Sequence, residues 1–305
     1  MSILPNTRDS TAAYRRGVVL VLLAGVCWSS AGLGIRLIET ASVWQILFYR
    51  SLALAPFLLL VITLRGQGSP FRAVRAAGVS GIVGGGALSV AFFGAIFSIQ
   101  TTTVANAVFL FAAAPFMTAA LGIAILREPV RGATWIAMTV AIGGIAVMVT
   151  GGFALGRWVG NAAALASALG FAVFTIALRW KKTEDMMPAV FLAGVFSIIV
   201  AGAVCVATDQ PFLLPARDVA IALGMGVFQV GAGLVLYTAG SKAIPAGELA
   251  LLSTGEVVLS PLWVWLFLSE TASLYTLGGG AILLAALAGN AISGMRRKPL
   301  PVAMG

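Results

Sequence analysis

The sequence predicts an all-α polytopic membrane protein built from two related halves. Of its 305 residues, 60% are hydrophobic and only 10% are charged, and the mean hydropathy is +1.03. A soluble domain carries roughly a quarter charged residues, so this chain cannot supply a water-exposed surface of ordinary composition. Its apolar residues form continuous runs of helix length. A membrane β-barrel would instead show alternating segments of about ten residues.

Ten apolar runs are separated by short polar loops, and no long polar domain interrupts them. A bilayer core about 30 Å thick is crossed by about twenty helical residues, so each run is predicted to be one span. The first run is expected to be retained, because no small-residue cleavage pattern follows it. The runs are 17–37, 43–64, 74–98, 103–126, 132–150, 158–179, 187–207, 217–240, 246–268 and 273–294.

The fourth run has a counterpart in the ninth. The segment 103–128 is apolar for more than twenty residues and ends in Glu; shifted by 142 positions it falls on 245–270, which has the same features. With a shift of 143, Arg36 falls on Arg179. The chain therefore divides into two repeats of five spans, 17–150 and 151–294. Since five is odd, the second repeat is expected to be inverted in the membrane, with a substrate site between the repeats.

The basic residues predict the orientation. If the N-terminal segment 1–16 is cytoplasmic, 15 of the 19 Lys and Arg residues lie on the cytoplasmic side, including those of the tail 295–305. Because Lys and Arg collect in cytoplasmic loops, both termini are predicted to be cytoplasmic, which requires an even number of spans. The 15 residues are Arg8, Arg15, Arg16, Arg65, Arg72, Arg75, Arg127, Arg131, Arg179, Lys181, Lys182, Lys242, Arg296, Arg297 and Lys298.

Composition also excludes several classes of function. The net charge of +9 follows from this topology, and no aromatic-basic interleaving indicates binding to nucleic acid. The chain has no histidine, and its two cysteines, Cys27 and Cys205, lie inside apolar runs. Histidine-based metal sites and catalytic dyads are thereby excluded, and no cofactor or metal ion is expected. An intramembrane enzyme is therefore disfavoured, while a membrane scaffold without transport activity is a further alternative.

These features resemble the drug/metabolite transporter superfamily, in its EamA-type branch of ten-helix exporters. They include the five-plus-five arrangement, the short loop 100–103, Pro115 in the fourth span, and the terminal Glu128 and Glu270. The first span, LLAGVCWSSAGLGIRLI at 22–38, is similar to the Trp-Ser…Gly-Leu…Ile-Arg pattern of the YddG-like amino-acid exporters. The resemblance implies a central cavity lined by spans 1, 3, 4, 6, 8 and 9, with spans 5 and 10 to the side.

The resemblance also implies a function. We expect a secondary transporter that exports amino acids, aromatic or other hydrophobic ones, across a bacterial inner (plasma) membrane by alternating access. The alternative is an exporter of cationic drugs or other small metabolites. The expected partners are the small-molecule substrate and the lipid bilayer; the oligomeric state is left open, and a monomer is compatible with the sequence.

One departure from the repeat concerns proline. Pro115 aligns with Val257, and the second repeat has Pro261 one helical turn later. Proline removes a hydrogen bond and bends a helix, so both prolines are predicted hinges. The two repeats are expected to bend at different depths.

Carboxylates inside the ninth span are candidate coupling groups. Glu256 lies near the predicted midplane, and Ser253 and Ser260 share its helix face. Desolvation favours the protonated form of a lone carboxyl group, as a proton carrier requires, and an anion there would also bind an amine. Glu248 lies two turns earlier. The alternative is that these carboxylates pair with a cation or cap a break in the backbone.

Arg50 and Arg36 each have a functional and a structural interpretation. Arg50, inside the second span, would bind a substrate carboxylate or serve the structure; the structural role is favoured because span 2 is not expected to line the cavity. Arg36 and Glu39 would form a local pair or an outer gate. Glu128 and Glu270 are expected to be boundary residues, one of them paired with Arg127 or Arg131.

Aromatic walls with few polar groups suit hydrophobic amino acids, although such residues also pack helices together. The residues predicted to line the cavity are Trp28, Ser30, Phe92, Asn106, Phe109, Phe171, Gln229, Tyr237, Ser253 and Glu256.

Overall fold

The structure is a bundle of helices. The computed structural model describes residues 7–65, 70–128, 130–154, 157–180, 185–242, 244 and 246–295, and within these ranges every regular element is helical. The first repeat comprises α1 (Thr7–Ser29), α2 (Ala31–Arg36), α3 (Val43–Leu64), α4 (Pro70–Thr101), α5 (Val104–Phe111), α6 (Ala114–Leu126) and α7 (Gly132–Ala154). The second comprises α8 (Trp158–Trp180), α9 (Met187–Ala207), α10 (Ala216–Gly224), η1 (Met225–Ala232), α11 (Gly233–Ser241), α12 (Ala246–Leu268) and α13 (Leu274–Met295).

Nine of the ten predicted spans coincide with helical runs that are long and apolar enough to cross a membrane, counted over the described residues. At the ninth predicted span the helix is α12, where the counted apolar stretch, Gly255–Leu268, is shorter than a span. The all-helical membrane class is therefore confirmed in the described part of the chain, while the number ten stays a prediction. Exposed side chains along the spans are large and apolar, as contact with lipid requires, for example Leu60, Ile136 and Phe267.

Several spans are interrupted, and the interruptions differ between the repeats. The first span divides into α1 and α2 at Ser30, and the fourth into α5 and α6, with Pro115 in the first turn of α6. The corresponding ninth span is the single helix α12, which contains Pro261. The repeats thus differ here, as the offset prolines predict. Whether either proline acts as a hinge stays a prediction.

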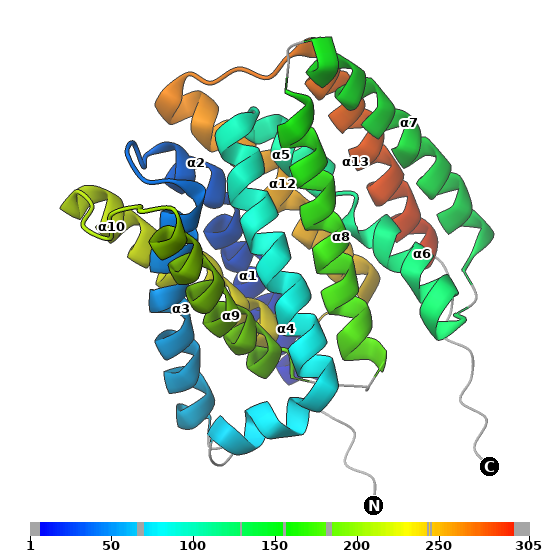
Figure 1. The fold of residues 1–305 in the computed structure, drawn as a ribbon. Helices are drawn as coiled ribbons and strands as arrows, with labels where there is room; N and C mark the ends of the chain where they lie inside the picture. The colour runs from blue at the N-terminus through cyan, green and yellow to red at the C-terminus, as the bar shows by residue number, and fades with distance from the viewer. Residues whose placement is uncertain are drawn as a thin grey trace, which may run out of the picture.

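The third and eighth spans contain irregular backbone. α4 turns sharply at Gly78, whose φ of 52° and ψ of −143° are accessible to glycine and costly for other residues. In Figure 1 the short first part of α4 lies across the end of the bundle, and the rest runs through it. The eighth span passes from α10 into α11 through the π-helix η1. π-helical turns are rare and frequently occur at functional sites.

Helix packing follows the repeat. The repeat relates each span to the span five places along the chain. It therefore relates the contact between α4 and α8, in spans 3 and 6, to the contact between α11 and α1, in spans 8 and 1. Both contacts are extensive. The pairs α3–α9 and α7–α13 exchange with themselves. α7 and α13 pack against each other at one side of the bundle (Figure 1), where spans 5 and 10 were expected. Close approach of α4 and α8 is possible because Gly94 and Gly170 lie against backbone atoms of the other helix.

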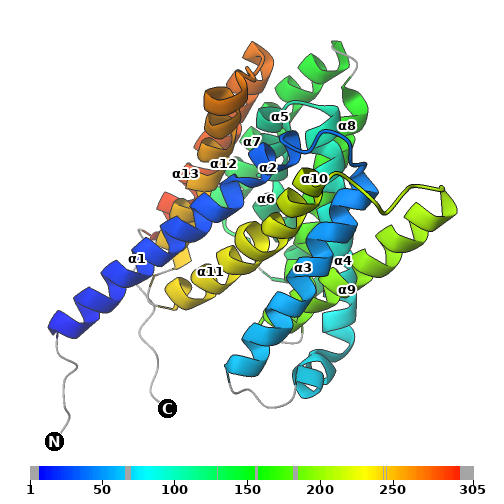
Figure 2. The ribbon, with the colours of Figure 1, turned by 90° about the vertical axis from the view of Figure 1, so that its left-hand side faces the viewer.

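The start of α1 and the end of α13 lie at the same end of the bundle (Figures 1 and 2), as an even number of crossings requires. We call this the terminal end. The opposite end, which holds α2 and the start of α5, is called the far end. The terminal end is the predicted cytoplasmic side.

Candidate functional site

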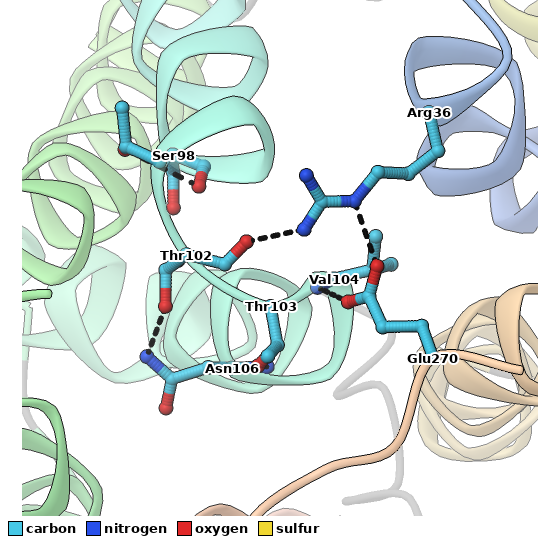
Figure 3. Close-up of polar contacts among 8 residues, drawn as sticks. Arg36, Ser98, Thr102, Thr103, Val104, Asn106 and Glu270 are labelled. Atoms are coloured by element: carbon cyan, nitrogen blue, oxygen red, sulfur yellow. Dashed lines mark hydrogen bonds and ion pairs between the residues drawn. The ribbon is translucent and has the colours of Figure 1, made fainter. Parts of the chain in front are cut away.

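At the far end, an ion pair joins the two repeats (Figure 3). Arg36, the last residue of α2, donates from Nε to Oε2 of Glu270 at 2.7 Å. Its Nη2 donates to the carbonyl oxygen of Thr102 at 2.6 Å, and the N–H of Val104 donates to Oε1 of Glu270 at 2.7 Å. The two side chains are 27% and 19% exposed, so solvent screens them only partly. These contacts tie α2, the α4–α5 loop and the segment after α12 together.

A second ion pair lies at the terminal end and is the repeat-related copy of the first. Arg179 in α8 donates from Nη2 to Oε2 of Glu128, after α6, at 2.5 Å. Arg179 is the counterpart of Arg36 at a shift of 143, and Glu128 is the counterpart of Glu270 at a shift of 142. Both pairs join one repeat to the other. The terminal-end pair is more exposed, at 47% and 38%, and no further contact of its charged groups is found among the described residues.

The expected local pairs are not formed. Glu39 pairs with Arg217 in α10, and not with Arg36. Glu128 pairs with Arg179, and not with Arg127 or Arg131. Spacing along the chain favoured partners a few residues away, whereas the fold brings together the ends of different spans. The 142- and 143-residue shifts relate the two pairs to each other, so either pair, once known, indicates the other.

Asn106 and Glu248, which are related by the shift of 142, also contact the other repeat. Asn106 is 3% exposed and donates from Nδ2 to Asn161 Oδ1 and, at 3.3 Å, to Thr102 Oγ1. Its own Oδ1 accepts from Thr276 Oγ1 at 3.3 Å. In this conformation Asn106 therefore joins helices at the far end, and its predicted contact with substrate stays a prediction.

Glu248 contacts the other repeat at the terminal end. Its Oε2 accepts from the hydroxyl of Tyr14 in α1 at 2.6 Å, in an exposed position. This contact is not a copy of Asn106–Asn161, because the counterpart of Tyr14 at a shift of 143 is Arg157. It is exposed, whereas the Asn106 contact is buried.

Two helix contacts at the far end also have no comparable copy at the terminal end. At the far end α2 packs against α4, and α5 packs against α12. The repeat relates these contacts to α8 with α11 and to α6 with α12 at the terminal end, where no comparable packing is found among the described residues. The far end is the closed end of this conformation.

Polar groups without partners lie between the ends. Oε2 of Glu256 and Oγ of Ser260, both in α12, are buried and lack a hydrogen-bond partner, and so does Oε1 of Gln229 in η1. Gly25 of α1 lies opposite Glu256, and Gly32 of α2 lies opposite Ser260. Unsatisfied buried polar atoms are uncommon in proteins, so these mark positions where a ligand or water would bind.

The remaining predicted cavity residues fall into separate groups. Trp28 and Tyr237 pack ring to ring at 5.1 Å between centroids. Phe171, the counterpart of Trp28 at a shift of 143, is 5.7 Å from Phe111 and is exposed. Phe109 instead lies against α13, beside Gly280.

Of the last two predicted residues, Ser30 makes a local hydrogen bond and Ser253 is described only in its backbone. Ser30 Oγ donates to the carbonyl oxygen of Cys27 at 2.6 Å. The side chain of Ser253 lies outside the described part of the chain, although its backbone belongs to α12.

The fold and these contacts define a multi-pass membrane protein of two repeats that contact each other at both ends. The chain belongs to the EamA-like transporter family, whose model matches residues 15–150 and again residues 158–292. The two matches correspond to the two repeats. Membership in this family makes the protein a membrane transporter of small molecules.

Solved structures support the same architecture. A protein known from a crystal structure aligns over 93% of this chain and 100% of its own chain, with a TM-score of 0.66 and 19% sequence identity. At that identity the likeness shows the fold alone. No curated protein matches the sequence.

Proposed function

We propose that this protein exports amino acids, aromatic or other hydrophobic ones, by alternating access between its two repeats. In this proposal ten spans cross a bacterial inner membrane with both termini in the cytoplasm, and the protein resembles the YddG-like exporters within its family. The closed far end faces outward, and the terminal end faces the cytoplasm.

The observation that carries the alternating-access proposal is the pair of repeat-related ion pairs, Arg36–Glu270 and Arg179–Glu128. They lie at opposite ends, and the far-end pair is the more buried. If the two repeats exchange conformations, the terminal-end pair becomes the buried one and the far-end pair loosens, so the substrate site opens to the other side. One structural unit, used twice, then supplies both gates.

The amino-acid proposal is tested by reconstitution. Purified protein in liposomes loaded with a panel of labelled amino acids should release the aromatic and aliphatic members faster than protein-free liposomes. Acidic amino acids serve as internal controls for leakage. Release at the protein-free rate for every amino acid would contradict the proposal.

A cationic drug or another metabolite is the second candidate cargo. The observation that favours a cation is the buried Oε2 of Glu256, which has no partner within the described chain. The same liposomes loaded with a lipophilic cation distinguish the two cargos, because each proposal predicts release of its own class.

A further inference from the structure

Arg50 is a buried cation to which the described chain offers no counter-charge. It lies in α3 and is 3% exposed. Its Nε and Nη2 have no hydrogen-bond partner, and each of the three ion pairs of the described chain joins other residues. The guanidinium lies over the ring of Phe92 in α4, with Cζ 4.4 Å from the ring centroid.

Neither snorkelling nor an ion pair accounts for Arg50. A snorkelling side chain keeps its charged group in water, whereas this one is buried. The contact with Phe92 offsets only part of the cost of removing a guanidinium from water. The fold itself does not require an arginine here, because the repeat-related position in α9 is Ala193, which is fully buried.

The surroundings of Arg50 also indicate a binding site. α3 crosses η1 here so closely that a Cβ added to Gly226 would lie 2.1 Å from the carbonyl oxygen of Arg50. η1 is the π-helical stretch, and it carries Gln229, whose Oε1 is also buried without a partner. Two adjoining elements thus each carry an unsatisfied buried polar group.

We propose that Arg50 is an anion subsite that binds the carboxylate of the transported molecule. A guanidinium presents paired N–H donors whose spacing matches the two oxygens of a carboxylate, and stacking on Phe92 holds its plane. The subsite rests on the proposed function and narrows its substrate to molecules that carry a carboxylate. It disfavours cationic drugs, since a buried positive charge opposes their entry.

Ligand binding to the full-length protein in detergent tests the subsite. The probes are L-phenylalanine, phenethylamine, which lacks the carboxylate, and 3-phenylpropionate, which lacks the amine. Binding is measured by the rise in melting temperature with ligand concentration. Wild-type protein should bind L-phenylalanine more tightly than phenethylamine. Arg50→Gln should weaken L-phenylalanine binding by roughly 30-fold or more, the loss expected when a buried charge pair loses one partner.

Arg65→Gln is the matched control, because it removes the same charge from the exposed end of α3. It should leave the affinity for L-phenylalanine unchanged, and Arg50→Lys should retain part of it. Equal binding of L-phenylalanine and phenethylamine by wild-type protein would overturn the subsite, even if Arg50→Gln does not fold. Wild-type affinity in folded Arg50→Gln protein would overturn it as well.

The third probe separates this inference from the proposed function. If 3-phenylpropionate binds in an Arg50-dependent manner while no amino acid binds, the subsite stands and the amino-acid proposal fails. If amino acids bind with equal affinity to wild type and to Arg50→Gln, the reverse holds. If no carboxylate binds, both are overturned.

Discussion

Glu270 is the residue on which closure of the far end depends. It accepts hydrogen bonds from the Arg36 side chain and from the Val104 backbone, so it bridges the two repeats. Hydrogen bonds to charged groups contribute about 1.5–3 kcal/mol each. Arg36→Glu and Glu270→Arg should therefore each reduce amino-acid efflux from liposomes about 10-fold. The double variant should recover part of the loss, but not all, because the contacts to Thr102 and Val104 are not rebuilt. Losses that simply add in the double variant would show that the pair does not act as a unit.

Glu256 differs from the paired carboxylates because its buried Oε2 has no partner in the described chain. If it carries the coupling proton, Glu256→Gln should transport amino acids at a rate that no longer changes when a pH gradient is imposed. Glu248→Gln is the control, because Glu248 is held by Tyr14 at the exposed terminal end. It should keep the response to the gradient. Wild-type efflux that is indifferent to the gradient would reject proton coupling altogether.

The charged residues also show how far the sequence predicts a site. The position of Glu256 inside the ninth apolar run predicts an intramembrane carboxylate, but the sequence does not assign partners to Arg36 or Glu128. Their partners lie 234 and 51 residues away along the chain. The structural interpretation of Arg50 depended on assuming that span 2 is remote from any ligand. The crossing of α3 with η1, which adjoins Arg50, arises from tertiary packing and cannot be predicted from sequence periodicity.

Among the helices, the positions of the spans were predictable because bilayer thickness imposes both their length and their apolar composition. The interruptions within the spans were only partly predictable. Pro115 signalled the break between α5 and α6, whereas no residue signalled the π-helix η1, which packs against α1 and α3.

The bend in α4 depends on the backbone of one residue. Gly78 has a positive φ, and no neighbouring atom lies within 4 Å of where its Cβ would be. Gly78→Ala should therefore destabilise the protein through backbone strain alone, by about 1–3 kcal/mol, with a lower melting temperature in detergent. Gly86→Ala, in the same helix, likewise meets no atom and has an ordinary φ. It should melt at or slightly above the wild-type temperature. Equal melting of both variants would show that the bend does not require glycine.

Across the whole molecule, repeat-related positions at the two ends form contacts that differ in burial. Both residues of the far-end ion pair have counterparts at the terminal end, yet Arg36–Glu270 is more buried than Arg179–Glu128. Two arrangements related by the repeat should then differ little in energy, because each buries at one end the kind of contact that it exposes at the other.

This near-balance predicts opposite effects of two equivalent substitutions. Ser98, near the end of α4, lies beside Thr102 (Figure 3) and is fully buried, so Ser98→Cys provides a thiol that is sealed while the far end is closed. With Cys27 and Cys205 replaced by Ser, a membrane-impermeant thiol reagent applied from the far side should label this cysteine slowly. Adding Glu270→Gln should raise the labelling rate about 10-fold, since the lost charged hydrogen bonds shift the population toward far-end opening. Adding Glu128→Gln should lower it or leave it unchanged, because that pair stabilises the alternative arrangement. Equal acceleration by both substitutions would mean that the pairs stabilise the bundle in general, and that the repeats do not exchange conformations.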